Sequence, residues 1–163
     1  MASSSGINQP HDRAGRDETH AERMDRNWDE LMQELRVAQT GVQILSGFLL
    51  TLPFQDRFSD LSDVETAIYL IAVILAAIAT VLIIAPVAYH RLLFRQQEKE
   101  LLVQAGNRFA RSGLLVLAFA VTTVIYLIFD VVLGTTAGVV AFAALFALFL
   151  TCWVLLPLWS ARD

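Results

Sequence analysis

The residue best suited to chemistry is a single acid inside a long apolar run. Asp130 is the only Asp, Glu, Lys, Arg or His between Gly113 and Ser160. A carboxylate inside a membrane span is costly and is by default a candidate functional group. It could be a proton or cation site, an ion-pair partner of Arg57, or a residue at headgroup level. We favour the last, because Gly134, the predicted end of the span, is only one helical turn away.

A stripe of amide and small side chains marks the first apolar segment. Its members recur in steps of three and four and therefore share one helix face. They are Gln39, Gln43, Ser46 and Gly47. Inside a membrane such a face contacts other helices or lines a cavity. We interpret it as a helix-contact face, with a pore as the alternative.

Aromatic and basic residues stand where apolar segments end. His90 and Arg91 follow the second segment, and Trp153 and Trp159 lie towards the end of the last one. Tryptophan rings favour the headgroup layer, and basic residues are common beside it. All four are therefore predicted interface anchors. For His90 and Arg91, a proton relay or a lipid-phosphate site remains an alternative.

Motifs of catalysis and cofactor binding are absent from the sequence. It has no P-loop, no dinucleotide fingerprint, and no Ser/His/Asp set on one side of the membrane. The histidines lack metal-ligand spacing, and Cys152 is the only cysteine. We therefore expect no metal, no cofactor and no enzymatic activity.

Composition indicates a membrane protein. Apolar residues make up 56% of the chain, charged residues 17%, and the mean hydropathy is +0.55, whereas soluble domains are about one quarter charged. The net charge of −4 provides no basic surface for nucleic acid. A helix crosses a bilayer with about 20 apolar residues. The sequence predicts an all-α membrane protein, a four-helix transmembrane bundle with spans at about 37–54, 64–89, 113–133 and 136–159.

The N-terminal third is divided by its polarity. Residues 1–16 are polar and rich in Ser and Gly, which predicts a disordered tail. Residues 17–36 are expected to form a cytoplasmic amphipathic helix that continues into the first span. Residues 37–163 then form the transmembrane domain.

An apolar seam follows this first helix. Met24, Trp28, Leu31 and Leu35 recur with a period of 3.5, which is typical of a helix that follows a partner helix. The partner could be the connection at 90–112 or the same helix of a second copy, and we slightly favour the second copy. The last span also carries small residues suited to helix packing. They are Ala137, Gly138, Ala141, Ala144 and Ala147.

Three sequence stretches carry a resemblance. They are ELRVAQTGVQILSGFLLTLPFQDRF at 34–58, APVAYHR at 85–91 and WVLLPLW at 153–159. Together they resemble small bacterial four-span membrane proteins catalogued as a domain of unknown function (the domain-of-unknown-function 6328 family). The resemblance covers roughly residues 20–160. It implies four spans and a bacterial plasma membrane, and it implies no activity.

These observations favour a non-enzymatic protein of the lipid bilayer. We expect a homo-oligomeric scaffold or an accessory subunit of a larger complex. A small ion channel or transporter is the alternative, with the polar stripe and Asp130 along its path.

The distribution of Lys and Arg gives a testable orientation. Eleven lie before the first span, in the 90–112 connection or in the C-terminal tail, and Arg57 alone lies in the other connections. Cytoplasmic loops carry the excess of positive charge, which predicts cytoplasmic termini in the plasma membrane. Single cysteines introduced near Asp60 should react with an impermeant reagent from outside, and those near Lys99 only from the cytoplasm. Labelling of both from one side would contradict this topology.

Overall fold

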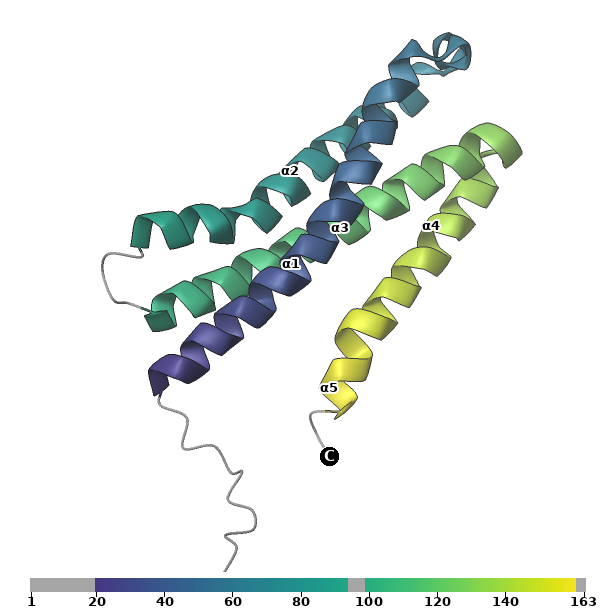
Figure 1. The fold of residues 1–163 in the computed structure, drawn as a ribbon. Helices are drawn as coiled ribbons and strands as arrows, with labels where there is room; N and C mark the ends of the chain where they lie inside the picture. The colour runs from purple at the N-terminus through teal and green to yellow at the C-terminus, as the bar shows by residue number, and fades with distance from the viewer. Residues whose placement is uncertain (1–19, 94–98, 161–163) are drawn as a thin grey trace, which may run out of the picture.

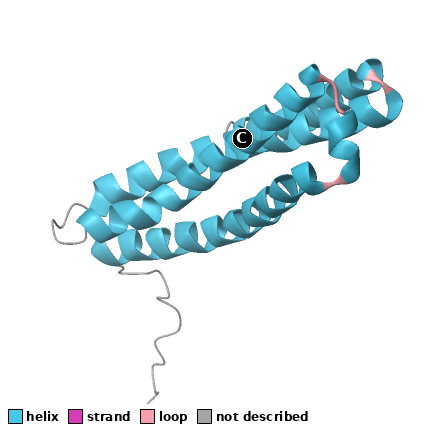
Figure 2. Cartoon of the chain, turned by 90° about the horizontal axis from the view of Figure 1, so that it is seen from above, coloured by secondary structure: helices cyan, strands magenta, loops and turns pink. Residues whose placement is uncertain are grey.

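A computed structural model describes residues 20–93 and 99–160, with side chains over 22–89 and 103–160. Its long helices are α1 (His20–Thr51), α2 (Asp63–Leu93), α3 (Lys99–Leu133) and α4 (Thr135–Leu150). Short elements are the 3₁₀ helices η1 (Leu52–Phe54) and η2 (Asp56–Asp60), the π-helical η3 (Thr151–Leu155), and α5 (Leu156–Ser160). The described ranges contain no strand (Figures 1 and 2), which confirms the all-α class.

Four stretches are long and apolar enough to cross a bilayer. They are Glu22–Phe54, Asp63–Tyr89, Val103–Leu133 and Thr135–Ser160. The shortest has 26 residues, or roughly 39 Å of helix against about 30 Å of hydrocarbon. The chain is therefore a multi-pass membrane protein, as predicted. The first helix continues without a break into the first span, whereas the predicted tail at 1–16 lies outside the described residues.

The spans alternate in direction, so α1 begins and α5 ends at the same end of the bundle (Figure 1). This end is named the terminal end below. The opposite end, formed by residues 52–62 and Gly134, is named the loop end.

The core lies between α1, α2 and α3 and depends on small side chains of α2. Ala72, Ala76 and Ala79 are at most 1% exposed. Such residues let helix backbones approach closely inside a membrane. A first cluster holds Leu31, Leu35, Val42, Ala79, Ile83 and Ala110. A second holds Leu49, Tyr69, Ala72, Ala76, Ala120 and Leu127.

Two glycines of α3 receive the neighbouring helices. A Cβ atom on Gly113 would lie 2.8 Å from Cγ1 of Ile83 and 3.3 Å from the Ile83 backbone nitrogen. A Cβ atom on Gly106 would lie 2.8 Å from Cδ2 of Leu31 and 3.1 Å from the ring of Trp28. Glycine therefore sets the distance of α2 and of α1 from α3.

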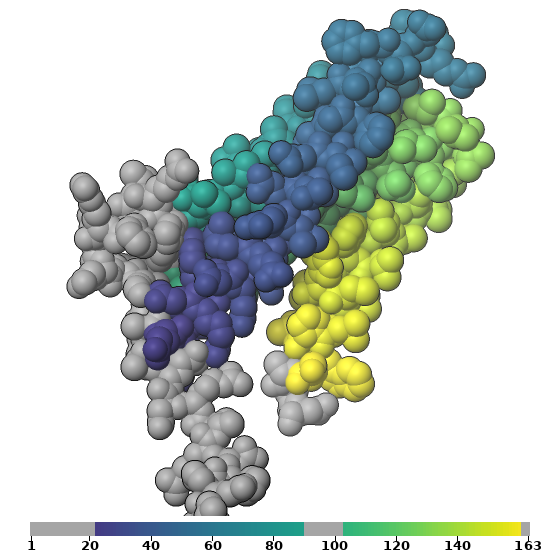
Figure 3. All heavy atoms as spheres, viewed as in Figure 1, coloured from purple at the N-terminus to yellow at the C-terminus, as the bar shows by residue number. Residues whose placement is uncertain are grey.

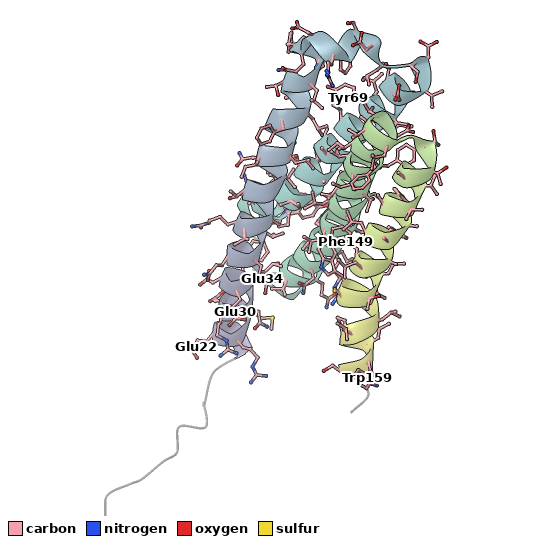
Figure 4. The ribbon with its side chains drawn as sticks, turned by 90° about the vertical axis from the view of Figure 1, so that its right-hand side faces the viewer. Glu22, Glu30, Glu34, Tyr69, Phe149 and Trp159 are labelled. Atoms are coloured by element: carbon pink, nitrogen blue, oxygen red, sulfur yellow. The ribbon has the colours of Figure 1, made fainter. Side chains whose placement is uncertain are left out.

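Side-chain hydrogen bonds close the loop end. The backbone N–H of Ser62 donates to Glu65 over 2.7 Å, and the N–H of Glu65 donates to the Ser62 hydroxyl over 3.3 Å. This reciprocal pair is a capping box for α2. The Tyr69 hydroxyl, labelled in Figure 4, donates to the carbonyl of Leu49 over 2.8 Å. It thereby satisfies one of the carbonyls that the end of α1 leaves free.

Helix α4 packs on α3 and on no other long helix of the described chain. Gly134 makes the turn between them at φ 92°, a conformation that favours glycine. A Cβ atom on Gly138 would lie 3.0 Å from the Tyr126 carbonyl oxygen, so the backbones nearly touch there. The rings of Phe119 and Phe146 continue the contact, with their centroids 5.0 Å apart. Towards the terminal end, α4 diverges from α1 (Figures 1 and 3).

The last span includes a π-helical turn that the sequence pattern did not predict. Pro157 has no N–H, and its ring clashes with the carbonyl four residues earlier in a regular α-helix. The wider turn at Thr151–Leu155 precedes it and accommodates this clash. Every residue from Thr151 to Ser160 is exposed, so this stretch makes no extensive contact with another span of the described chain.

The close approach at Gly113 can be measured. Gly113→Ala should lower the free energy of unfolding by about 1–3 kcal/mol, because the new methyl group overlaps Ile83 and its backbone. Gly41→Ala is the control: nothing lies within 4 Å of its Cβ position inside α1, so stability should not fall and should rise by up to about 1 kcal/mol, because alanine favours a helix over glycine. Unfolding in mixed micelles of increasing denaturing detergent gives both values. Equal effects would contradict the packing.

Candidate functional site

Asp130 lies in the last turn of α3 and is half-buried. Its carboxylate interacts with the hydroxyl of Tyr126, one turn earlier, and Glu65 of α2 is close enough to act electrostatically on Tyr126. The Asp130 Cβ would lie 3.2 Å from a Cβ on Gly138 of α4. Two helices, α2 and α3, therefore bring two carboxylates and a phenol together at the loop end, beside the first turn of α4.

This arrangement favours a structural role for the acids. Glu65 already accepts hydrogen bonds from the N–H and the hydroxyl of Ser62, at 2.7 and 2.6 Å. The described residues contain no group of three or more His, Cys, Asp or Glu placed to hold a metal. The ion pair of Asp130 with Arg57 is also not formed within the described chain, which corrects that alternative. Arg57 instead lies in η2, in the connection beyond α1.

The polar stripe on α1 flanks the core. Gln39 and Ser46 are half-buried, whereas Gln43 and Gly47 are exposed. The buried residue between them is Val42, which is 1% exposed. One side of the stripe therefore borders the contact of α1 with the core, and the other side is exposed on the surface of the chain.

The interior of the bundle offers little polar lining. In the described part of the chain, Thr122 is the one buried residue with a polar aliphatic or charged side chain. Its hydroxyl donates to carbonyls of its own helix, those of Ala118 at 2.9 Å and Phe119 at 3.0 Å. Together with Tyr69, whose hydroxyl is bound to Leu49, it interrupts an otherwise apolar core. A water-filled path through the described core of one chain would therefore have few free polar groups to line it.

The apolar seam of α1 packs within the chain. Leu31 and Leu35 are 7% and 4% exposed and belong to the core with α2 and α3. Trp28 packs beside them against Gly106, and Met24 is half-buried. This corrects the preference for a second copy at the seam, because α3 already covers Leu31 and Leu35. The glycine at Gly106 is the physical reason, since it lets α1 approach α3 closely.

The predicted interface anchors fall into two groups. Trp153 and Trp159 are 44% and 69% exposed, and Trp159 lies at the terminal end of the last span (Figure 4). The Trp153 ring contacts Phe149 edge-on at 4.8 Å. Their depth in a bilayer stays a prediction. The side chains of His90 and Arg91 lie outside those described.

The grooves between the described helices include two with distinctive linings. One, of about 810 Å³, lies between α3 and α4 and is lined in part by Ala137, Ala141 and Ala144. These alanines belong to the small residues whose spacing along the last span predicted a helix-packing face. The other, of about 420 Å³, lies between α2 and α3 beside Arg108. Sequence reasoning missed it, although the spacing of Gln104, Arg108 and Ser112 places three polar groups on one helix face.

Together these features define a multi-pass membrane protein folded as a four-helix bundle. The chain belongs to the DUF6328 family, a family of unknown function whose profile matches residues 17–157. The family suggested by the three sequence stretches is thereby confirmed. Neither a curated protein nor a solved structure matches the chain.

The structural role of Asp130 gives a further prediction. Asp130→Asn keeps the size of the side chain and an oxygen that can accept from Tyr126, so the free energy of unfolding should fall by about 1 kcal/mol or less. Proton or cation flux through liposomes containing the purified protein should not change. If the wild type conducts and this variant alone does not, Asp130 belongs to a transport path.

Proposed function

We propose that this protein is a non-enzymatic, homo-oligomeric membrane protein that serves as a scaffold or accessory subunit. We place it in a bacterial plasma membrane with both termini in the cytoplasm, in keeping with the Lys and Arg distribution. The observation that supports this role best is the fourth span. It contacts one long helix of the described chain and leaves a long face uncovered.

The uncovered face has the residues that membrane helix contacts use. Small side chains line the α3–α4 groove from the α4 side, with Ala137, Ala141 and Ala144 on successive turns. Larger side chains such as Phe129 and Ile125 line it from α3. A helix can seat on such a ridge of alanines closely enough for van der Waals contact along its length, which lipid chains match poorly.

A second copy of the chain is the occupant we propose. A two-fold axis beside α4 would bring the alanine face of each copy against the other, giving an isologous interface. The exposed amide of Gln43 supports association as well, because a polar group in hydrocarbon is costly without a hydrogen-bond partner. In an assembly, a neighbouring chain can supply that partner.

A channel or transporter is a second candidate, which the exposed part of the polar stripe favours. Gln43 and Gly47 are exposed on α1 while the core beside them is apolar. A polar path would therefore run between copies and not within one. Ion flux through an assembly of several copies would distinguish this function from a scaffold.

A matched pair of substitutions tests the assembly. Ala144→Leu fills the groove, so the proposed oligomer should dissociate to monomers in nanodiscs and mild detergent. Ala143→Leu makes the same change on an exposed residue that does not line the groove, and it should leave the oligomer intact. Native mass spectrometry reports the state of both. A wild type that stays monomeric at all concentrations would contradict homo-oligomerisation.

A further inference from the structure

The groove beside Arg108 has a mixed lining. Gln104, Arg108 and Ser112 of α3 supply polar groups, and Leu82 of α2 together with Phe109 supplies apolar ones. The polar residues are four apart, so they stand one above another on successive turns of α3. The groove therefore combines a row of polar side chains, running along the axis of α3, with an apolar wall.

Arg108 is a cation without a partner in the described chain. Its side chain is exposed and forms no hydrogen bond or ion pair with any described residue. A guanidinium stays charged at every physiological pH and presents several N–H donors in a planar fork. Gln104 and Ser112 add an amide and a hydroxyl donor within one turn on either side. This set of donors matches the oxygens of a phosphate.

The position of the groove along the spans matches the headgroup layer. The second apolar stretch ends at Tyr89, and the third begins at Val103. Arg108 is thus less than two turns inside the end of its span, where basic side chains can reach headgroups. The rings of Tyr89 and Phe109 lie 5.2 Å apart and join the two helices at this level.

The apolar wall continues deeper into the membrane. Leu82 lies seven residues before Tyr89 on α2, roughly 10 Å further along the helix axis. At that depth α2 and α3 close against each other at Gly113, whose Cβ position lies 3.3 Å from the Cβ of Leu82. A ligand bound by Arg108 at one end would therefore lay an apolar chain on Leu82 at the other.

We propose that this groove binds an anionic phospholipid, with the headgroup phosphate on Arg108 and an acyl chain along Leu82. Basic pockets between membrane helices are recognised sites for anionic headgroups. A zwitterionic lipid carries a positive group that Arg108 repels, so the site prefers phosphatidylglycerol to phosphatidylcholine. The site stands on the geometry of one chain and does not depend on homo-oligomerisation.

Native mass spectrometry of the full chain in mild detergent tests the site by titration with each of these two lipids. Wild type should bind phosphatidylglycerol more tightly than phosphatidylcholine. Arg108→Gln should weaken phosphatidylglycerol binding about tenfold, because it removes the charge-assisted hydrogen bonds. Arg111→Gln is the matched control: it is exposed on the same helix, does not line the groove, and should change the affinity by less than about twofold.

A second pair tests the groove while all charges remain. Ser112→Phe fills the groove and should also weaken phosphatidylglycerol binding, whereas Asn107→Phe, on an exposed residue outside it, should not. Circular dichroism establishes that each variant is folded. Unchanged binding in Arg108→Gln or Ser112→Phe would overturn the proposal. So would equal losses in both arginine variants, or competition by inorganic phosphate at the concentration of the lipid, which would indicate a free-phosphate site.

Discussion

Close packing at glycine joins α3 to each of the other three spans. Gly106 receives α1, Gly113 receives α2, and Gly138 of α4 lies against Tyr126 of α3. In a bilayer, lipid chains solvate apolar side chains about as well as other side chains do, so helices associate through close van der Waals contact. Small residues make that contact possible, and their positions on α3 and α4 therefore set the arrangement of the bundle.

This arrangement decides which surfaces remain for other molecules. Because Gly106 draws α1 onto α3, the seam at Leu31 and Leu35 becomes core. Because Gly138 fixes α4 to α3 alone, the alanines at 137, 141 and 144 are left lining an open groove. The same principle that builds the bundle thus leaves one unused ridge of small residues, which is why we place a second copy there.

Hydropathy and helix length were sufficient to predict the architecture. Each apolar run is long enough to cross lipid, and in lipid a helix satisfies all of its backbone hydrogen bonds internally. The partner of the seam could not be predicted, because a 3.5 period indicates that a partner follows the helix without identifying it. The Arg108 groove could not be predicted either, because it exists only where Tyr89 of α2 meets Phe109 of α3. That pairing depends on the register set by Gly113.

The two ends of the bundle differ in what their polar side chains do beside the core. At the loop end, Ser62 and Glu65 cap α2, and Tyr69 holds the end of α1. At the terminal end, Arg108 has no partner in the described chain, and residues 151–160 extend beyond the contact with α3. An unpaired charge and an uncovered helix surface are available to ligands and partners, whereas the hydroxyl of Tyr69 and the carboxylate of Glu65 are already hydrogen-bonded. A helix seated in the α3–α4 groove would continue along this exposed segment, so assembly would cover the last span at the same end of the bundle at which a lipid would cover Arg108.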